Sequence, residues 1–171
     1  MILLHPTFHP NFVQFIKEFN VTHDYFECHE VLEDYWKEVA PKQKSHPLTA
    51  LILMSTSMYH WRRGNNPGAL KTMKTSIKRL IETSGSPFYE TIDYSSLIQD
   101  TASSLIHMQE NEPFQPFLVS IKDPHLNSLV ENYNIKTSFD KNFLIHKHML
   151  RDRSEILAER EKSKKRRNDI L

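Results

Sequence analysis

The chain has 171 residues, of which 39% are hydrophobic, and its formal net charge is +1. That composition fits one domain with a real core, and the near-zero charge excludes a general electrostatic attraction to nucleic acid or to membranes. We expect a cytoplasmic protein, because one cysteine excludes an internal disulfide, the N-terminus lacks a signal peptide, and no apolar run could span a bilayer.

The pattern of apolar residues predicts an all-α fold of about five to six helices. Residues recur at helical spacing over 10–19, 22–40, 48–63, 67–83, 94–109 and 139–166. Pro113 and Pro116 predict an extended segment over 112–117, leading into a short edge segment over 118–121. A short helical turn is predicted over 125–133. The long C-terminal helix would complete the bundle.

The helix predicted over 48–63 is apolar on all sides, which is typical of a central helix. His60 shares a side of this helix with Leu53 and Thr56, so we expect the ring to be largely enclosed. The next helix, 67–83, carries one apolar stripe, and its cationic side chains are expected to form a solvated face. The stripe consists of Leu70, Met73, Ile77, Leu80 and Ile81.

The helix predicted over 22–40 places ionisable residues on the face that should be buried. On a helical wheel His29 lies between Trp36 and Glu33, well inside the apolar arc. His29 and Glu33 are four residues apart and therefore neighbours on one surface. Glu30 points about 100° away from His29, so we expect it to stay outside the pair, although it could reach over. A buried ionisable pair needs a hydrogen-bonding partner or a metal.

An ordered set of motifs resembles the domain-of-unknown-function family 309, an all-helical family of bacteria and archaea. The resemblance covers residues 20–83 and rests on the sequence of 25–36, the helix that ends at His60, and the segment 64–69. Cys28 departs from the pattern, where the family often has alanine. The family has no assigned activity, so the resemblance implies an orthogonal helical bundle and no function. We expect a family-like helical core over 1–84, with 85–171 as an extension packed on it in one domain.

The first interpretation of these residues is a metal or catalytic site. Two imidazoles and one carboxylate, from His29, His60 and Glu33, would suffice for a divalent zinc, iron or manganese ion with an open position. Four neighbours could support it: Tyr25, Glu30, Trp36 and Tyr59. Such an ion could serve a metal-assisted hydrolase, and a metal-free His29–Glu33 pair could act as a general base. The sequence His-Glu-x-x-Glu lacks the second histidine of the zincin motif.

The second interpretation is a protein-interaction module, in which the same His/Glu/Trp cluster is a buried polar network that fixes helix register. A homodimer could form through the heptad-spaced Phe143, Leu150 and Leu157 of the C-terminal helix. The third and least favoured interpretation is nucleic-acid contact through a basic tail from about residue 160, which contains Lys162, Lys164, Lys165, Arg166 and Arg167. Neither a substrate nor a partner can be named from the sequence.

Overall fold

The computed structural model describes residues 4–135. Within this range the chain forms six α-helices and no strand, with one isolated bridge between Ile92 and Ile121. The helices are α1 (Pro10–Lys17), α2 (Tyr25–Val39), α3 (Pro47–Arg62), α4 (Asn66–Glu82), α5 (Tyr94–Gln109) and α6 (Pro124–Asn132). The predicted all-α class is thus confirmed. The predicted C-terminal helix, with its heptad residues and basic tail, lies outside the described residues.

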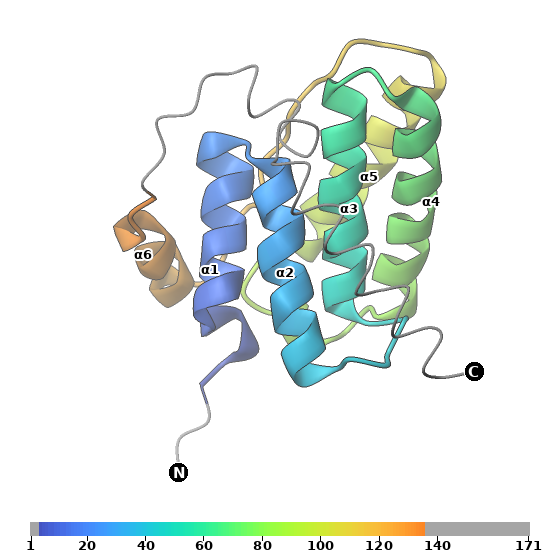
Figure 1. Ribbon diagram of the computed structural model, residues 1–171. Helices are drawn as coiled ribbons and strands as arrows, with labels where there is room; N and C mark the ends of the chain where they lie inside the picture. Colours follow the sequence, from blue (N-terminus) through green and yellow to red (C-terminus); the bar gives the residue numbers. More distant parts are fainter. Residues whose placement is uncertain (1–3, 136–171) are drawn as a thin grey trace, which may run out of the picture.

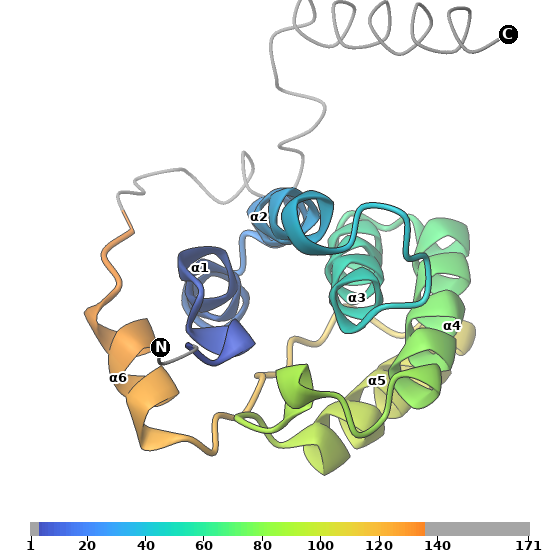
Figure 2. The same cartoon turned by 90° about the horizontal axis from the view of Figure 1, so that it is seen from below.

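Helices that follow one another in the chain pack side by side. Contacts link α1 to α2, α2 to α3, α3 to α4 and α4 to α5, while α6 covers the outer side of α1 (Figure 1, Figure 2). The axes of α1, α2 and α3 are roughly aligned in Figure 1, so this part of the molecule is an up-and-down arrangement and not the orthogonal crossing that we expected. Short connections favour this result because they return each helix beside its predecessor.

The α3 helix is central, as its apolar character on all sides predicts. It lies between α2 and α4, and most of its residues are buried. Small polar residues allow the close approach of α3 and α4: the Ser57 hydroxyl donates to the Ala69 carbonyl at 2.7 Å, and the Ser76 hydroxyl donates to the Ala50 carbonyl at 2.7 Å. Each hydroxyl is buried and satisfied, so the pair fixes the register of α3 against α4.

One residue of the predicted stripe on α4 does not reach the core. Ile81 is 60% exposed, whereas Leu80 and Met73 are fully buried. The buried positions of α4 are Ala69, Met73, Ser76 and Leu80. These follow a three-to-four-residue spacing, and Ile81 lies about 100° beyond Leu80 on the helix. The stripe is therefore narrower than predicted.

The extended segment that follows α5 completes the core. Phe114 packs edge-on against both Tyr25 and Trp61, at centroid distances of 5.9 Å and 5.3 Å. One cluster of buried residues therefore includes side chains from both halves of the chain. Among the described helices, none combines the length and the apolar character that crossing a membrane requires.

Candidate metal centre between α2 and α3

The position of α2 is fixed by its N-terminal cap and by its core face. The Asp24 carboxylate accepts a hydrogen bond from the Glu27 amide at 3.0 Å, which satisfies one of the free amides of the first turn. Tyr25, Cys28 and Leu32 are fully buried. Cys28 donates to the Phe15 carbonyl, and burial raises the pKa of its thiol, so this residue packs in the core and is a poor nucleophile.

His29 and Glu33 lie at the edge of this core face and are not buried within it. Their side chains are 31% and 32% exposed, which corrects the prediction of a buried pair. The neighbouring Phe26 and Trp36 are also only half-buried. The wheel showed which side of α2 is apolar, but α3 covers only part of that side. The His/Glu cluster therefore faces the two pockets that His29 shares, which we together call the groove. His29 and Glu33 are too exposed for the fully buried polar network that we expected as the alternative.

Two carboxylates approach the single imidazole of His29. The Nε2 atom lies 3.3 Å from Glu33 Oε2, and the Nδ1 atom lies 3.2 Å from Glu30 Oε1. Of the two alternatives for Glu30, the structure has the one in which it reaches over, because its side chain is long enough to bend back beside its neighbour. Lys37 Nζ lies 2.9 Å from the second oxygen of Glu33, and that hydrogen bond raises the pKa of Lys37.

These residues form a group that could hold a metal. His29, Glu30 and Glu33 each offer one ligand atom, and the three atoms lie within 4.8 Å of one another. Two ligands about 2.1 Å from one ion are roughly 3.4 Å apart in tetrahedral geometry. Because the two carboxylates contact opposite nitrogens of the ring, one of them would have to turn toward the other nitrogen for all three ligands to meet one ion. In the part of the chain that the structure describes, no other group of three such residues meets this condition.

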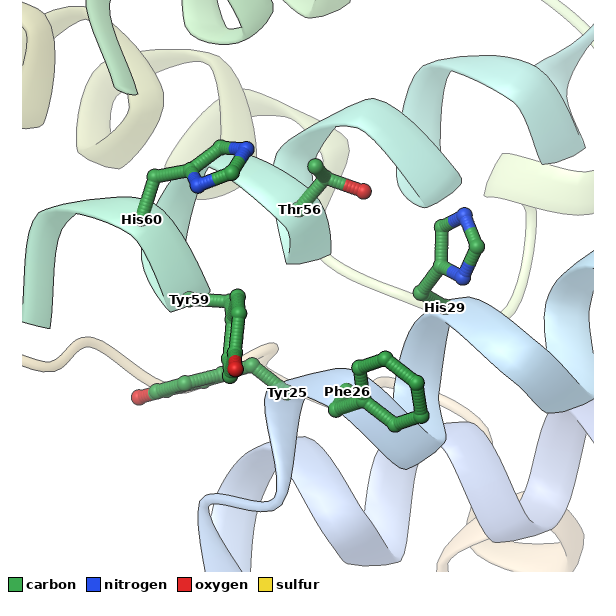
Figure 3. A pocket seen from close by; sticks show the side chains of 6 residues that line it. All are labelled: Tyr25, Phe26, His29, Thr56, Tyr59 and His60. Atoms are coloured by element: carbon green, nitrogen blue, oxygen red, sulfur yellow. The ribbon is translucent and has the colours of Figure 1, made fainter. Parts of the chain in front are cut away.

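His60 faces the same groove from α3. It lines a pocket of about 150 Å³ together with Tyr25, Phe26, His29, Thr56 and Tyr59. Figure 3 shows the His29 and His60 rings on opposite sides of Thr56, with the two tyrosines and Phe26 along another side of the pocket. The structure thus brings His60 to the pocket but does not include it in the donor group of His29.

The turn between α3 and α4 explains how His60 is held. Gly64 ends α3 with a φ of +84°, which favours glycine. Asn65 then caps α4 by accepting from the Gly68 amide at 3.2 Å. A Cβ atom on Gly68 would lie 2.6 Å from the Asn65 amide nitrogen, so a larger residue there would displace the capping Asn65 side chain. The Gly-Asn-Asn-Pro-Gly segment is therefore a tightly packed turn between α3 and α4.

That cap also orients the His60 ring. Because the Asn65 oxygen accepts from Gly68, its Nδ2 atom is the group turned toward His60 Nδ1, at 3.3 Å. An amide nitrogen donates, so His60 Nδ1 accepts and Nε2 carries the proton. Burial, and secondly the charge of Arg63, lower the pKa of His60, which keeps the ring neutral. Its free polar atom is thus an N–H donor.

A second pocket lies on the other side of His29. It has a volume of about 290 Å³ and is bordered by α2, α3, α4 and the segment before α3. Its lining residues are His29, Glu33, Trp36, Lys44, Thr49, Ile52, Leu53 and Arg79. The sequence placed Lys44 in a polar linker and Arg79 on a solvated face. No pattern in the sequence could have brought them to His29, because they come from different elements.

Three of the four predicted supporting residues line the two pockets, and the fourth, Glu30, contacts His29. Tyr25 and Tyr59 form walls of the smaller pocket, and burial raises the pKa of the Tyr25 hydroxyl, with the nearby Arg62 opposing it. Trp36 borders the larger pocket, and its indole N–H donates to the Gln43 carbonyl at 3.0 Å. Glu30 is the only one of the four that contacts the His29 ring through a carboxylate.

Comparison with known proteins places the sequence motifs in a family. No solved structure matches the chain. The Bacillus subtilis (strain 168) protein named "Uncharacterized protein YpuF" is 32% identical, over 91% of this chain and 94% of its own length. A family model described as "Domain of unknown function (DUF309)" matches residues 12–72, which contain His29, Glu30, Glu33 and His60. The chain belongs to the DUF309 family.

Proposed function

We propose that this protein binds a divalent transition metal ion through His29, Glu30 and Glu33. The observation that carries the proposal is the approach of two carboxylates to opposite nitrogens of one imidazole, at 3.2 Å and 3.3 Å. A neutral imidazole has one N–H, so one of the two nitrogens would face a carboxylate with lone pair against lone pair. A cation on that nitrogen removes the repulsion with the adjacent carboxylate, and the second carboxylate joins the ion by turning away from the other nitrogen.

The mixed donor set limits the kind of ion. One imidazole and two carboxylates suit zinc, manganese or iron, and are poor ligands for soft ions that prefer thiolates. Glu33 Oε1 is already paired with Lys37, which leaves Oε2 for the ion. Three protein ligands leave an open position, which is the arrangement of catalytic zinc sites. A metal-assisted hydrolysis is the class of reaction that such an ion would serve.

His60 has a different role in this proposal from the ligand role that the sequence indicated. Its Nδ1 atom is occupied by Asn65 and its Nε2 atom carries a proton, so the ring offers a hydrogen bond and no lone pair. The ring lines the pocket that His29 also lines. We therefore assign His60 as a donor to a molecule bound beside the ion.

One alternative has a specific observation in its favour. A proton could take the place of the ion, because an imidazolium would donate to both carboxylates, and Lys37 already supplies a second cation at 2.9 Å from Glu33. The cluster would then be a surface ion-pair network on an interaction module, and added metal would not bind.

The test is a titration of the full-length, untagged protein with Zn²⁺ and with Mn²⁺ after stripping and dialysis. We expect saturable binding of one ion per chain, with release of protons because the metal displaces them from the ligands. Either His29→Ala or Glu33→Gln should abolish it. Glu38→Gln is the matched control, since Glu38 lies on the same helix and contacts another imidazole, that of His9, at 3.5 Å.

Three outcomes separate the alternatives. Absence of saturable binding by the unaltered chain contradicts a metal centre and favours the ion-pair network. Equal loss in Glu38→Gln would mean that the ion binds acidic surface without selectivity. Loss of the ion in His60→Gln would restore His60 as a ligand and contradict the role assigned to it here.

A further inference from the structure

We propose that the larger pocket beside His29 binds a small organic anion, whose carboxylate or phosphate group is held by Arg79 and Lys44. The pocket lies between α2, α3 and α4 and has a volume of about 290 Å³, which is at the small end of ligand sites in proteins. This inference goes beyond metal binding and does not require it, because the two cations come from other elements than the metal group.

Lys44 is held at the pocket by its backbone. The Thr49 hydroxyl donates to the Lys44 carbonyl at 2.6 Å. The residues before and after Lys44 in the chain also form hydrogen bonds. The Gln43 carbonyl accepts from Trp36 at 3.0 Å, and the Ser45 hydroxyl donates to the Glu82 carboxylate on α4 at 3.0 Å. The segment before α3 is thus tied to α2, α3 and α4, so the Lys44 side chain is presented to the pocket by a fixed main chain.

Arg79 supplies the second cation and carries an unsatisfied donor. Its Nε atom is shielded from solvent and has no hydrogen-bond partner among the residues that the structure describes. In the same range, no carboxylate oxygen lies within ion-pair distance of Arg79 or Lys44. A ligand in the pocket can reach only the solvent-accessible part of the Arg79 side chain. The planar guanidinium matches carboxylate and phosphate groups with two parallel hydrogen bonds.

The remaining walls set the size and polarity of the ligand. Trp36, Ile52 and Leu53 line the pocket with apolar surface, so they would contact the hydrocarbon part of a molecule. Glu33 also lines the pocket, but Lys37 neutralises its charge at 2.9 Å. The two cations therefore decide the charge preference of the pocket. The ligand that fits is a compact molecule with an apolar body and one oxyanion.

The experiment is a calorimetric titration of the full-length, metal-stripped protein with phenyl phosphate, phenylacetate, inorganic phosphate and phenol. We expect at least one of the two aromatic anions to bind saturably, and to bind more tightly than inorganic phosphate, while phenol does not bind. The tighter of the two identifies the head group as phosphate or carboxylate. Arg79→Gln should weaken binding about ten- to a hundredfold, because it removes a charged hydrogen-bond donor.

Lys78→Gln is the matched control, since Lys78 precedes Arg79 on α4 but is exposed. It should bind the anion as the unaltered chain does, and Arg79→Lys should retain part of the affinity by keeping the charge. Binding that is absent for both aromatic anions, equal for phenol, or unchanged by Arg79→Gln overturns the proposal. The protein contains no metal in this assay, so failure of the metal titration and failure of this one are separate results.

Discussion

The core face and the groove face of α2 differ in burial, although their residues are adjacent in the sequence. On the core face Cys28 and Leu32 have no exposed surface. On the groove face, His29 and Glu33 are each about a third exposed, at 31% and 32%. The first set can only pack, because no ligand could reach it. The second set keeps enough contact with the core to be positioned and enough solvent access to bind.

The same division holds on the helices beside it. On α3 the buried Tyr59 lies next to His60, which faces the groove. On α4 the buried Ser76 lies one turn before Arg79, which lines the larger pocket. Each of the three helices thus contributes one stripe to the core and at least one polar residue to the groove. Mutations on these three helices should therefore affect either stability or binding, depending on which stripe they change.

The largest effect that tests this division is expected from the core face. Leu32→Ala should reduce the free energy of unfolding by about 2–5 kcal/mol, because it removes buried methyl groups and leaves a cavity. Chemical denaturation measures the change, with Asp34→Asn on the exposed side of α2 as the control. The folded fraction should still bind metal. A loss below about 1 kcal/mol would show that this face tolerates repacking.

The groove face should respond less in stability. Glu33→Gln should change the free energy of unfolding of the metal-free protein by less than about 1 kcal/mol, since ion pairs of partly exposed groups contribute little. Its partners His29 and Lys37 can both turn to water, being 31% and 60% exposed. Denaturation beside Glu38→Gln measures this. If Glu33→Gln instead lowers the free energy of unfolding as much as Leu32→Ala does, the carboxylate belongs to the core, and the distinction between a core face and a groove face is wrong.

The sequence predicted the fold better than it predicted the groove. The helix over 94–109 has the bounds that the pattern indicated, and α3 is central because its apolar residues surround the helix. Both features depend on local periodicity, which the sequence carries. The burial of His29 depends instead on how much of α2 is covered by α3, and a helical wheel contains no information on the width of that contact.

Residues that meet from separate elements could not be predicted at all. Arg79 and Lys44 reach one pocket only because α4 and the segment before α3 pack on either side of it. The reach of Glu30 to His29 was only the less favoured alternative for another reason: the wheel gives the directions of Cβ atoms, and a glutamate side chain can bend away from its Cβ direction. The sequence predicted the turn at Gly64, but the hydrogen bond between Asn65 and His60 depends on how the two side chains are oriented, which the sequence does not reveal.

The smallest effect is a change in pH dependence on α3. Burial lowers the pKa of His60 below its ordinary value of 6.5, so between these two values the folded chain binds fewer protons than the unfolded chain. The free energy of unfolding should therefore fall as the pH falls through this window. In His60→Gln the stability should decrease less steeply as the pH falls. Melting temperatures measured at pH values from 7 to 5 report this pH dependence.

The dependence of melting temperature on pH should not vanish in His60→Gln, because burial also lowers the pKa of His46, at the start of α3. Combining His60→Gln with His46→Gln should remove more of the slope than either change alone, and His125→Gln serves as the control outside α3. A slope that His60→Gln leaves unaltered would mean that the ring is as accessible to protons as it is in the unfolded chain. His60 would then belong with the solvent-exposed residues, and its assignment as a fixed neutral donor in the groove would be wrong.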